Sequence, residues 1–98
     1  KSKTFGNFFS LVLSEKENTY LYIPEGFAYG FCSLTNNTNL HYRCTNYRDK
    51  NSETGIYWKD KSLNINWPNQ KFSISSKDKK FLLFKDFIET KNFKKIKW

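Results

Sequence analysis

The stretch Phe27-Ala28-Tyr29-Gly30-Phe31-Cys32-Ser33-Leu34-Thr35-Asn36-Asn37-Thr38-Asn39-Leu40-His41-Tyr42-Arg43-Cys44-Thr45 decides the expected fold. Two runs rich in aromatic and apolar residues, 27–34 and 39–45, flank a short polar segment. Asparagine tolerates the left-handed backbone that a tight turn requires, so Asn36 and Asn37 are expected at its centre. The stretch therefore predicts two antiparallel strands joined by a hairpin turn.

The register of this hairpin places particular side chains together. Phe31 lies opposite Tyr42 and Tyr29 lies opposite Cys44, so these residues share one face of the hairpin. Cys32 falls on the other face with His41, which disfavours a disulfide and fits a reducing compartment. The two tyrosines are either core aromatics with satisfied hydroxyls or the lining of a ligand pocket in which a phenol donates a proton.

Further short extended runs surround the hairpin. They are separated by polar turns or by Pro24-Glu25-Gly26, and they fall at residues 7–13, 19–23, 55–58, 62–67 and 71–75. Short strands at regular spacing predict a mainly antiparallel β domain, either a sandwich or a barrel. With 98 residues the chain is expected to form a single domain, 1–98. Its open strand edges favour a dimer or a missing partner segment.

The carboxyl-terminal end has a different pattern. Ser76-Lys77-Asp78 is typical of a helix start, and Phe81, Phe84 and Ile88 then fall at helical spacing. Residues 87–98 form a basic tail that contains aromatic residues. Such a tail is either a solvated terminus or a contact to a membrane surface or single-stranded nucleic acid.

Composition narrows the function classes. The net charge is +8, which permits phosphate, nucleic acid or anionic lipid as a ligand without choosing among them. Almost all of this positive charge is lysine, whereas arginine is the usual reader of base edges. One histidine and two cysteines do not suffice for a metal centre of the usual kinds. No apolar run reaches the length of a membrane span, and no export leader is recognisable, so we expect a cytoplasmic protein.

Several blocks in this chain resemble the dTDP-4-dehydrorhamnose 3,5-epimerase family, in the family's order and spacing. The blocks are Ile23-Pro24-Glu25-Gly26-Phe27-Ala28, Tyr42-Arg43-Cys44-Thr45-Asn46-Tyr47, Glu53-Thr54-Gly55-Ile56-Tyr57-Trp58-Lys59-Asp60, Leu63-Asn64-Ile65-Asn66-Trp67-Pro68 and Ser75-Ser76-Lys77-Asp78. Thr4-Phe5-Gly6, Leu13-Ser14-Glu15-Lys16-Glu17-Asn18 and Tyr29-Gly30-Phe31 also resemble the family. With them the resemblance covers about residues 4 to 86 and matches roughly the second half of the family's sequence.

The resemblance implies a fold and a reaction. The fold is an antiparallel jelly-roll (cupin-like) sandwich, incomplete in this chain, with a short C-terminal helix. The protein would be a homodimer that uses no metal and no cofactor. The substrate would be dTDP-4-keto-6-deoxy-glucose, epimerised at C3 and C5 on the path to dTDP-L-rhamnose. A base removes a proton beside the 4-ketone, an enolate forms, and an acid returns a proton to the opposite face.

The resemblance also implies roles for individual residues. Tyr42 matches the proton donor, and Asp78 matches an aspartate that orients the catalytic histidine. Lys77 and Glu53 match positions that contact the nucleotide sugar. Tyr29 stands where the family usually has a substrate-contacting histidine. Arg48 and its neighbour Tyr47 fall at the aromatic position that stacks on thymine.

The catalytic base belongs to the half of the family that this chain does not resemble. His41 does not replace it, because the hairpin register turns His41 away from Tyr42. We therefore expect this chain alone to lack turnover. Two alternatives stay open: a truncated, non-catalytic relative that only binds a nucleotide sugar, and a β module that binds nucleic acid through lysines and aromatics. A related subfamily acts at one carbon only, so the exact sugar also stays open.

Overall fold

The structure, a computed structural model, describes residues 2–94. Within these residues it contains five short helical elements. Their bounds are η1 Glu15–Glu17, η2 Lys50–Ser52, α1 Ser76–Lys79, α2 Phe84–Phe87 and α3 Lys91–Lys94. Within the described part of the chain, no helix is long and apolar enough to cross a membrane.

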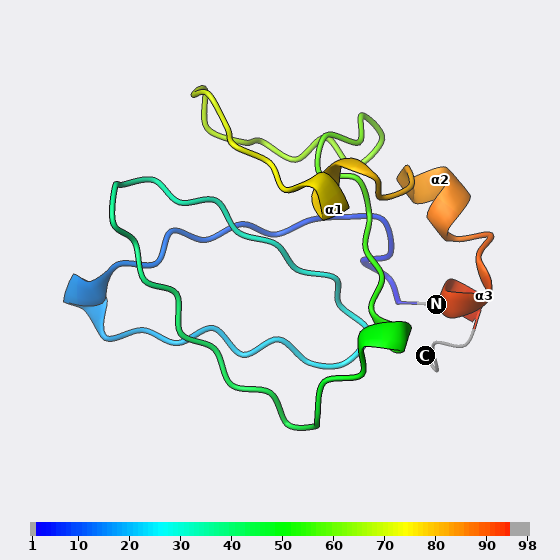
Figure 1. Cartoon of the computed structure of the whole chain (residues 1–98), viewed down its shortest axis with the longest axis horizontal. Helices are drawn as coiled ribbons and strands as arrows, with labels where there is room; N and C mark the ends of the chain where they lie inside the picture. The colour runs from blue at the N-terminus through cyan, green and yellow to red at the C-terminus, as the bar shows by residue number, and fades with distance from the viewer. Residues whose placement is uncertain (1, 95–98) are drawn as a thin grey trace.

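The first half of the chain runs back and forth along the long axis of the molecule in elongated segments (Figure 1). The reversals between them fall where the sequence predicts turns. Ser14 caps η1 and Asn18 ends it with a φ of 45°. Asn37 lies in the hairpin turn with a φ of 59°, and Gly26 has a φ of 90°. These positions confirm the predicted turns at 14–18, 24–26 and 36–37.

Across residues 2–94 the elongated segments do not pair into a β-sheet. The β pairing within these residues is one isolated parallel bridge between Ile56 and Leu82. The backbone nitrogen of Tyr57 donates to the carbonyl of Leu82 at 2.7 Å. At the hairpin turn, the hydroxyls of Thr35 and Thr38 lie 3.0 Å apart, as expected for residues that face each other across it. The predicted jelly roll and the hairpin register beyond this pair stay predictions. Cys32 and Cys44 are both free thiols, as expected.

The C-terminal helix differs from the expected one. The spacing of Phe81, Phe84 and Ile88 predicts one helix, but the structure has α1 and α2 with a non-helical link between them. Leu82, in that link, forms the bridge to Ile56. Pairing with a distant segment therefore outweighs local helical spacing here. The capping residue is Ser75, one residue before the predicted capping segment Ser76-Lys77-Asp78, and its hydroxyl accepts a hydrogen bond from the backbone nitrogen of Asp78.

The most buried apolar side chains lie where the two ends of the chain meet. Phe87 and Phe93 are buried, and their rings pack at 5.9 Å between centroids. Phe5 contacts Phe84 at 5.4 Å and Phe93 at 5.7 Å. The part of the basic tail within the described residues therefore packs through Phe93 instead of lying free in solvent. The remainder of the tail, 95–98, lies outside the described residues.

A second aromatic cluster surrounds Trp58. Its indole ring lies edge-on to Trp67 at 6.0 Å and to Phe72 at 5.5 Å. The indole nitrogen of Trp67 donates to the carbonyl of Trp58 at 2.7 Å, so the polar atom of this half-buried ring is satisfied.

The molecule is more open than a folded domain of its size. Its accessible surface is 9846 Å², whereas a compact protein of this mass exposes about 5,900 Å². The radius of gyration is 14.6 Å, against about 13 Å for a compact chain of this length. Large apolar side chains on the elongated segments account for much of this surface, for example Phe9, Val12, Tyr20 and Tyr22. The first half thus leaves uncovered the residues that a sheet would bury.

Candidate functional site

Glu53 lies at the centre of a cluster of charged side chains. It follows η2, and its carboxylate accepts hydrogen bonds from Arg48 Nε at 2.5 Å and Arg48 Nη2 at 3.3 Å. Lys77, 24 residues further along the chain, donates to Oε2 at 2.9 Å. We call Arg48, Glu53 and Lys77 the charged cluster.

The two cations change the acidity of Glu53. Hydrogen bonds from Arg48 and then from Lys77 stabilise the carboxylate and lower the pKa of Glu53 to about 2. The same contact raises the pKa of Arg48, and Tyr42 adds a smaller electrostatic contribution in that direction. Glu53 is therefore ionised and Arg48 charged at neutral pH.

Helix α1 places Lys77 and Asp78 next to each other in its first turn. Ser75 caps this helix, because its hydroxyl oxygen accepts a 3.1 Å hydrogen bond from the backbone nitrogen of Asp78. The side chain of Lys77 reaches back to Glu53, whereas the carboxylate of Asp78 makes no hydrogen bond or ion pair within residues 2–94. An acceptor left open in this way is available to a group that the described chain does not supply.

The three predicted site tyrosines are exposed. The exposed fraction is 71% for Tyr42, 68% for Tyr29 and 98% for Tyr47. No ring contact joins any two of them in the described part of the chain. The structure thus brings together Arg48, Glu53 and Lys77 from the predicted site. It leaves the three tyrosines exposed, and of these Tyr42 adds the electrostatic contribution to Arg48.

Sequence reasoning missed the role of Asp60. This residue is 5% exposed, and Oδ1 accepts hydrogen bonds from the backbone nitrogens of Ser62 at 2.8 Å and Leu63 at 3.1 Å. Oδ2 accepts from the backbone nitrogen of Phe84 at 2.6 Å. Burial disfavours the charged form, but the hydrogen bond that the Ser62 hydroxyl donates to Oδ1, together with the three backbone hydrogen bonds, outweighs it, so the pKa of Asp60 is lowered. The sequence carried one local signal, an Asp two residues before a Ser, which is typical of a side-chain-stabilised turn.

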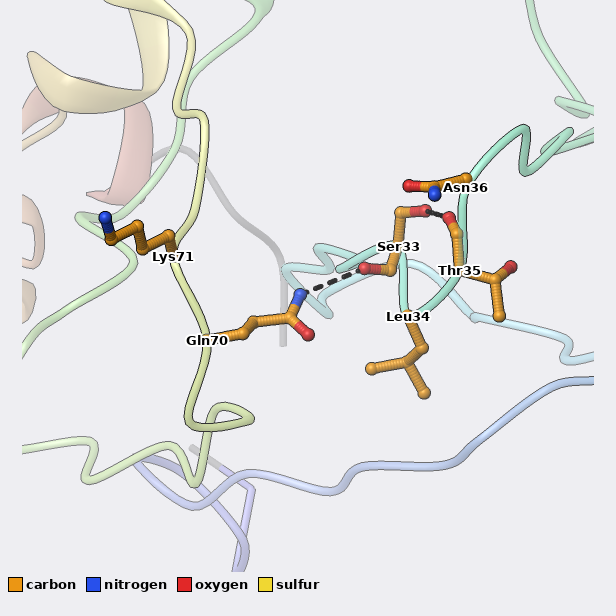
Figure 2. Close-up of a pocket in the computed structure, with 6 residues that line it drawn as sticks. All are labelled: Ser33, Leu34, Thr35, Asn36, Gln70 and Lys71. Carbon is orange, nitrogen blue, oxygen red and sulfur yellow. Dashed lines mark hydrogen bonds between the residues drawn. The ribbon is translucent and has the colours of Figure 1, made fainter.

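A shallow hollow of about 530 Å³ lies between the hairpin turn and the loop after Pro68 (Figure 2). Gln70 closes one side of it by donating from Nε2 to the carbonyl of Ser33 at 3.2 Å. On the other side the hydroxyl of Ser33 donates to the carbonyl of Thr35 at 2.8 Å. No residue of the predicted site lines this hollow, so we assign no role in the reaction to it.

Comparison with known proteins identifies the class of protein to which the charged cluster belongs. A model of the dTDP-4-dehydrorhamnose 3,5-epimerases matches residues 1–86. A protein of that description from Shigella flexneri is 46% identical over 77 residues, which cover 79% of this chain and 42% of the relative. One from Salmonella typhimurium is 40% identical over 79 residues, covering 80% and 43%. One from Escherichia coli is 34% identical over 91 residues, covering 92% and 49%.

The chain belongs to the dTDP-4-dehydrorhamnose 3,5-epimerase family, a family of isomerases of dTDP-rhamnose biosynthesis. It spans less than half the length of these curated relatives. No solved structure matches it.

Proposed function

We propose that this chain forms part of a dTDP-4-dehydro-6-deoxyglucose 3,5-epimerase and carries the proton donor of that enzyme. The observation that supports this most directly is the 2.9 Å contact between Glu53 and Lys77. These two residues are distant in sequence, and both were expected, from the family resemblance, to contact the nucleotide sugar. A shared ligand requires such residues to converge, and they do.

The proposed reaction needs an acid and a base on opposite faces of the sugar. The 4-ketone acidifies the protons at C3 and C5, so removal of one of them gives an enolate without a cofactor. Tyr42 then returns a proton from the other face. The base is a residue of the relatives' other half, and Asp78 orients it through the carboxylate that makes no hydrogen bond or ion pair within residues 2–94.

Tyr42 requires a covered site to perform this step. A phenol protonates an enolate efficiently only where water does not compete for it, and here the side chain of Tyr42 is largely exposed. In the proposal, the elongated segments 7–13, 27–34 and 39–45 are strands of an incomplete jelly roll. The remainder of a relative's length pairs with them, covers their apolar side chains and closes the site. The assembled enzyme is a homodimer of the cytoplasm.

The alternative function is a non-catalytic relative that binds a nucleotide sugar. Two observations favour it for the chain on its own: the exposure of Tyr42, and the carboxylate of Asp78, which makes no hydrogen bond or ion pair in the described part of the chain. It predicts that the nucleotide sugar raises the melting temperature without any turnover.

Deuterium exchange into the substrate distinguishes the epimerase from the non-catalytic binding protein. The chain is incubated in heavy water with dTDP-4-keto-6-deoxy-glucose, with and without the amino-terminal half of the Shigella flexneri relative, and exchange at C3 and C5 is followed by proton NMR. We expect exchange only in the mixture, and loss of C3 and C5 epimerisation with Tyr42→Phe but not with the control Tyr20→Phe. Exchange by the chain alone would show that it holds its own base. No exchange in either sample would favour the binding protein.

A further inference from the structure

A second hollow lies between residues 57–62 and residues 83–85. Its volume is about 600 Å³, which falls within the range of small-ligand sites, roughly 300–1,000 Å³. We call it the lysine hollow, because Lys59, Lys61 and Lys85 are among the residues that line it. In the described structure, none of the residues to which the family resemblance gives a role lines this hollow. The proposed reaction therefore leaves it unused.

Two hydrogen bonds hold the walls of the lysine hollow together. The backbone nitrogen of Tyr57 donates to the carbonyl of Leu82 at 2.7 Å. The buried carboxylate of Asp60 accepts from the backbone nitrogen of Phe84 at 2.6 Å. Leu83 lies between these two anchor points and lines the hollow. The two chain segments that form the hollow are therefore fixed to each other before any ligand binds.

The lining of the lysine hollow is largely apolar. Tyr57 is half-buried there, and Leu83 is 40% exposed. Lysine side chains add methylene stems that cover apolar surface while the ammonium group stays in water. An apolar group placed in the hollow removes this surface from water, which favours binding.

The three lysines give the hollow a positive charge. All three are exposed, and their ammonium groups make no ion pair or hydrogen bond among residues 2–94. Nζ of Lys59 lies 5.9 Å from the centre of the Trp58 ring, which places this ammonium group beside an aromatic surface. The lining also contains the carboxylate of Asp60, but its oxygens already accept hydrogen bonds from the protein. Three ammonium groups outnumber this one carboxylate, so the hollow favours anions.

We propose that the lysine hollow binds a small organic acid with an apolar body, of the class of the aromatic carboxylates. The apolar body occupies the space lined by Tyr57 and Leu83, and the carboxylate lies among the three ammonium groups. Each ammonium–carboxylate contact is a charge-assisted hydrogen bond. A bare anion gains nothing from the apolar lining, and an uncharged ring gains nothing from the lysines, so the two features together select the ligand.

Binding of naphthoate to the 98-residue chain tests this site. It is compared with naphthamide, which keeps the rings without the charge, and with acetate, which keeps the charge without the rings. We expect naphthoate to bind more tightly than either, with intermolecular NOEs from its ring protons to Tyr57 and Leu83. The exposed rings of Phe9 and Tyr20 attract apolar compounds in general. NOEs confined to such rings, or equal binding of naphthamide, would overturn the proposal.

Charge removal distinguishes the lysine hollow from general attraction to a basic protein. We expect Lys61→Gln and Lys85→Gln each to weaken naphthoate binding by about two- to five-fold, as for exposed ion pairs, and the double variant to weaken it by about ten-fold. Lys16→Gln is the matched control, because it removes an exposed lysine from η1, at the opposite end of the molecule from α2 (Figure 1). Circular dichroism of each variant checks the fold. Equal weakening by Lys16→Gln would contradict a site at the hollow.

This inference is independent of the proposed function. Lys61→Gln and Lys85→Gln are expected to leave deuterium exchange in the mixture unchanged. Naphthoate binding that depends on these lysines, in a mixture without exchange, would keep the lysine hollow and remove the epimerase. Exchange that is lost in these two variants would show that the hollow serves the reaction, which would overturn its assignment to a separate ligand.

Discussion

The carboxylate of Asp60 accepts a 2.6 Å hydrogen bond from the backbone nitrogen of Phe84, the first residue of α2. The N-cap residue of this helix, Leu83, has no side-chain acceptor and makes no cap hydrogen bond. Helix starts leave backbone N–H groups without intrahelical partners, so Asp60 supplies from 24 residues away what the local sequence lacks. This one carboxylate ties the turn at 60–63 to the C-terminal helices.

Replacing this carboxylate is expected to destabilise the chain. Asp60→Asn puts an NH₂ group where an oxygen now accepts, either from Phe84 or from Ser62 and Leu63, and an unsatisfied buried donor costs about 1–3 kcal/mol. Urea denaturation checks this value. Asp86→Asn, in α2 and with no side-chain hydrogen bond or ion pair among residues 2–94, is the control and is expected to change stability by less than about 0.5 kcal/mol. An equal loss of unfolding free energy from both substitutions would contradict the capping role of Asp60.

Stability is expected to fall in acid through the same residue. The pKa of Asp60 is lowered in the folded state, so its contribution is present above the unfolded value of 3.8 and is lost as pH falls below it. Melting temperature measured between pH 6 and pH 2 tests this. The decline in this range should be smaller in Asp60→Asn than in the wild type, and parallel declines would contradict the assignment.

Gly55 is expected to reject a side chain. A Cβ atom at this position would lie 2.6 Å from Cε2 of Phe81 and equally close to the rest of that ring edge. Gly55→Ala should therefore cost about 1–3 kcal/mol of unfolding free energy through overpacking. Gly30→Ala is the matched control because nothing lies within 4 Å of its Cβ position. Restoration of stability by Phe81→Leu in the Gly55→Ala background would identify the ring as the cause.

The indole nitrogen of Trp67 is expected to stabilise the second aromatic cluster. Trp67→Phe keeps most of the ring but leaves the carbonyl of Trp58 without its donor, and the expected loss is about 1 kcal/mol. Thermal unfolding followed by circular dichroism gives the value. Tyr47→Phe, at a side chain 98% exposed, should leave the melting temperature unchanged. A melting temperature unaltered by Trp67→Phe would show that water replaces the indole.

Glu53 is expected to titrate near its lowered pKa of about 2, against the ordinary value of 4.5. Its stabilising effect is thus present above about pH 4.5 and is lost as pH falls toward 2. NMR titration of its side-chain carboxyl carbon measures this. Arg48→Gln should raise the pKa more than Lys77→Gln, because the Arg48 hydrogen bond is the larger cause. Lys71→Gln should not move it. An ordinary pKa in the wild type would mean that the cluster is not formed in solution.

Helices α1 and α2 show which helix features the local sequence pattern predicts and which it does not. The segment Ser76-Lys77-Asp78 predicts the capping position to within one residue of Ser75, because a cap involves only neighbouring residues. The spacing of Phe81, Phe84 and Ile88 predicts a continuous helix, which is wrong. Leu82 pairs with Ile56 instead, and nothing in the local sequence encodes that partner.

The candidate site residues also divide into those whose contacts the sequence anticipated and those whose positions it did not. Family resemblance selected Glu53, Lys77 and Arg48 as ligand contacts, and the structure joins them through one carboxylate. Resemblance also selected Tyr29 and Tyr42, whose side chains are exposed. The charged residues meet because ion pairs act between flexible side chains, whereas the proposed function assigns the positioning of the tyrosines to a sheet that stays a prediction.

The sequence by itself determined the turns, the free thiols and the family. Asn18, Asn37 and Gly26 set the turns through their own tolerance of positive φ, which requires no distant partner. Only the tertiary structure decided that Asp60 caps α2, that Phe93 packs on Phe5, and that Lys77 reaches Glu53. Each of these contacts joins residues far apart in the chain, and its formation depends on the packing of everything between them.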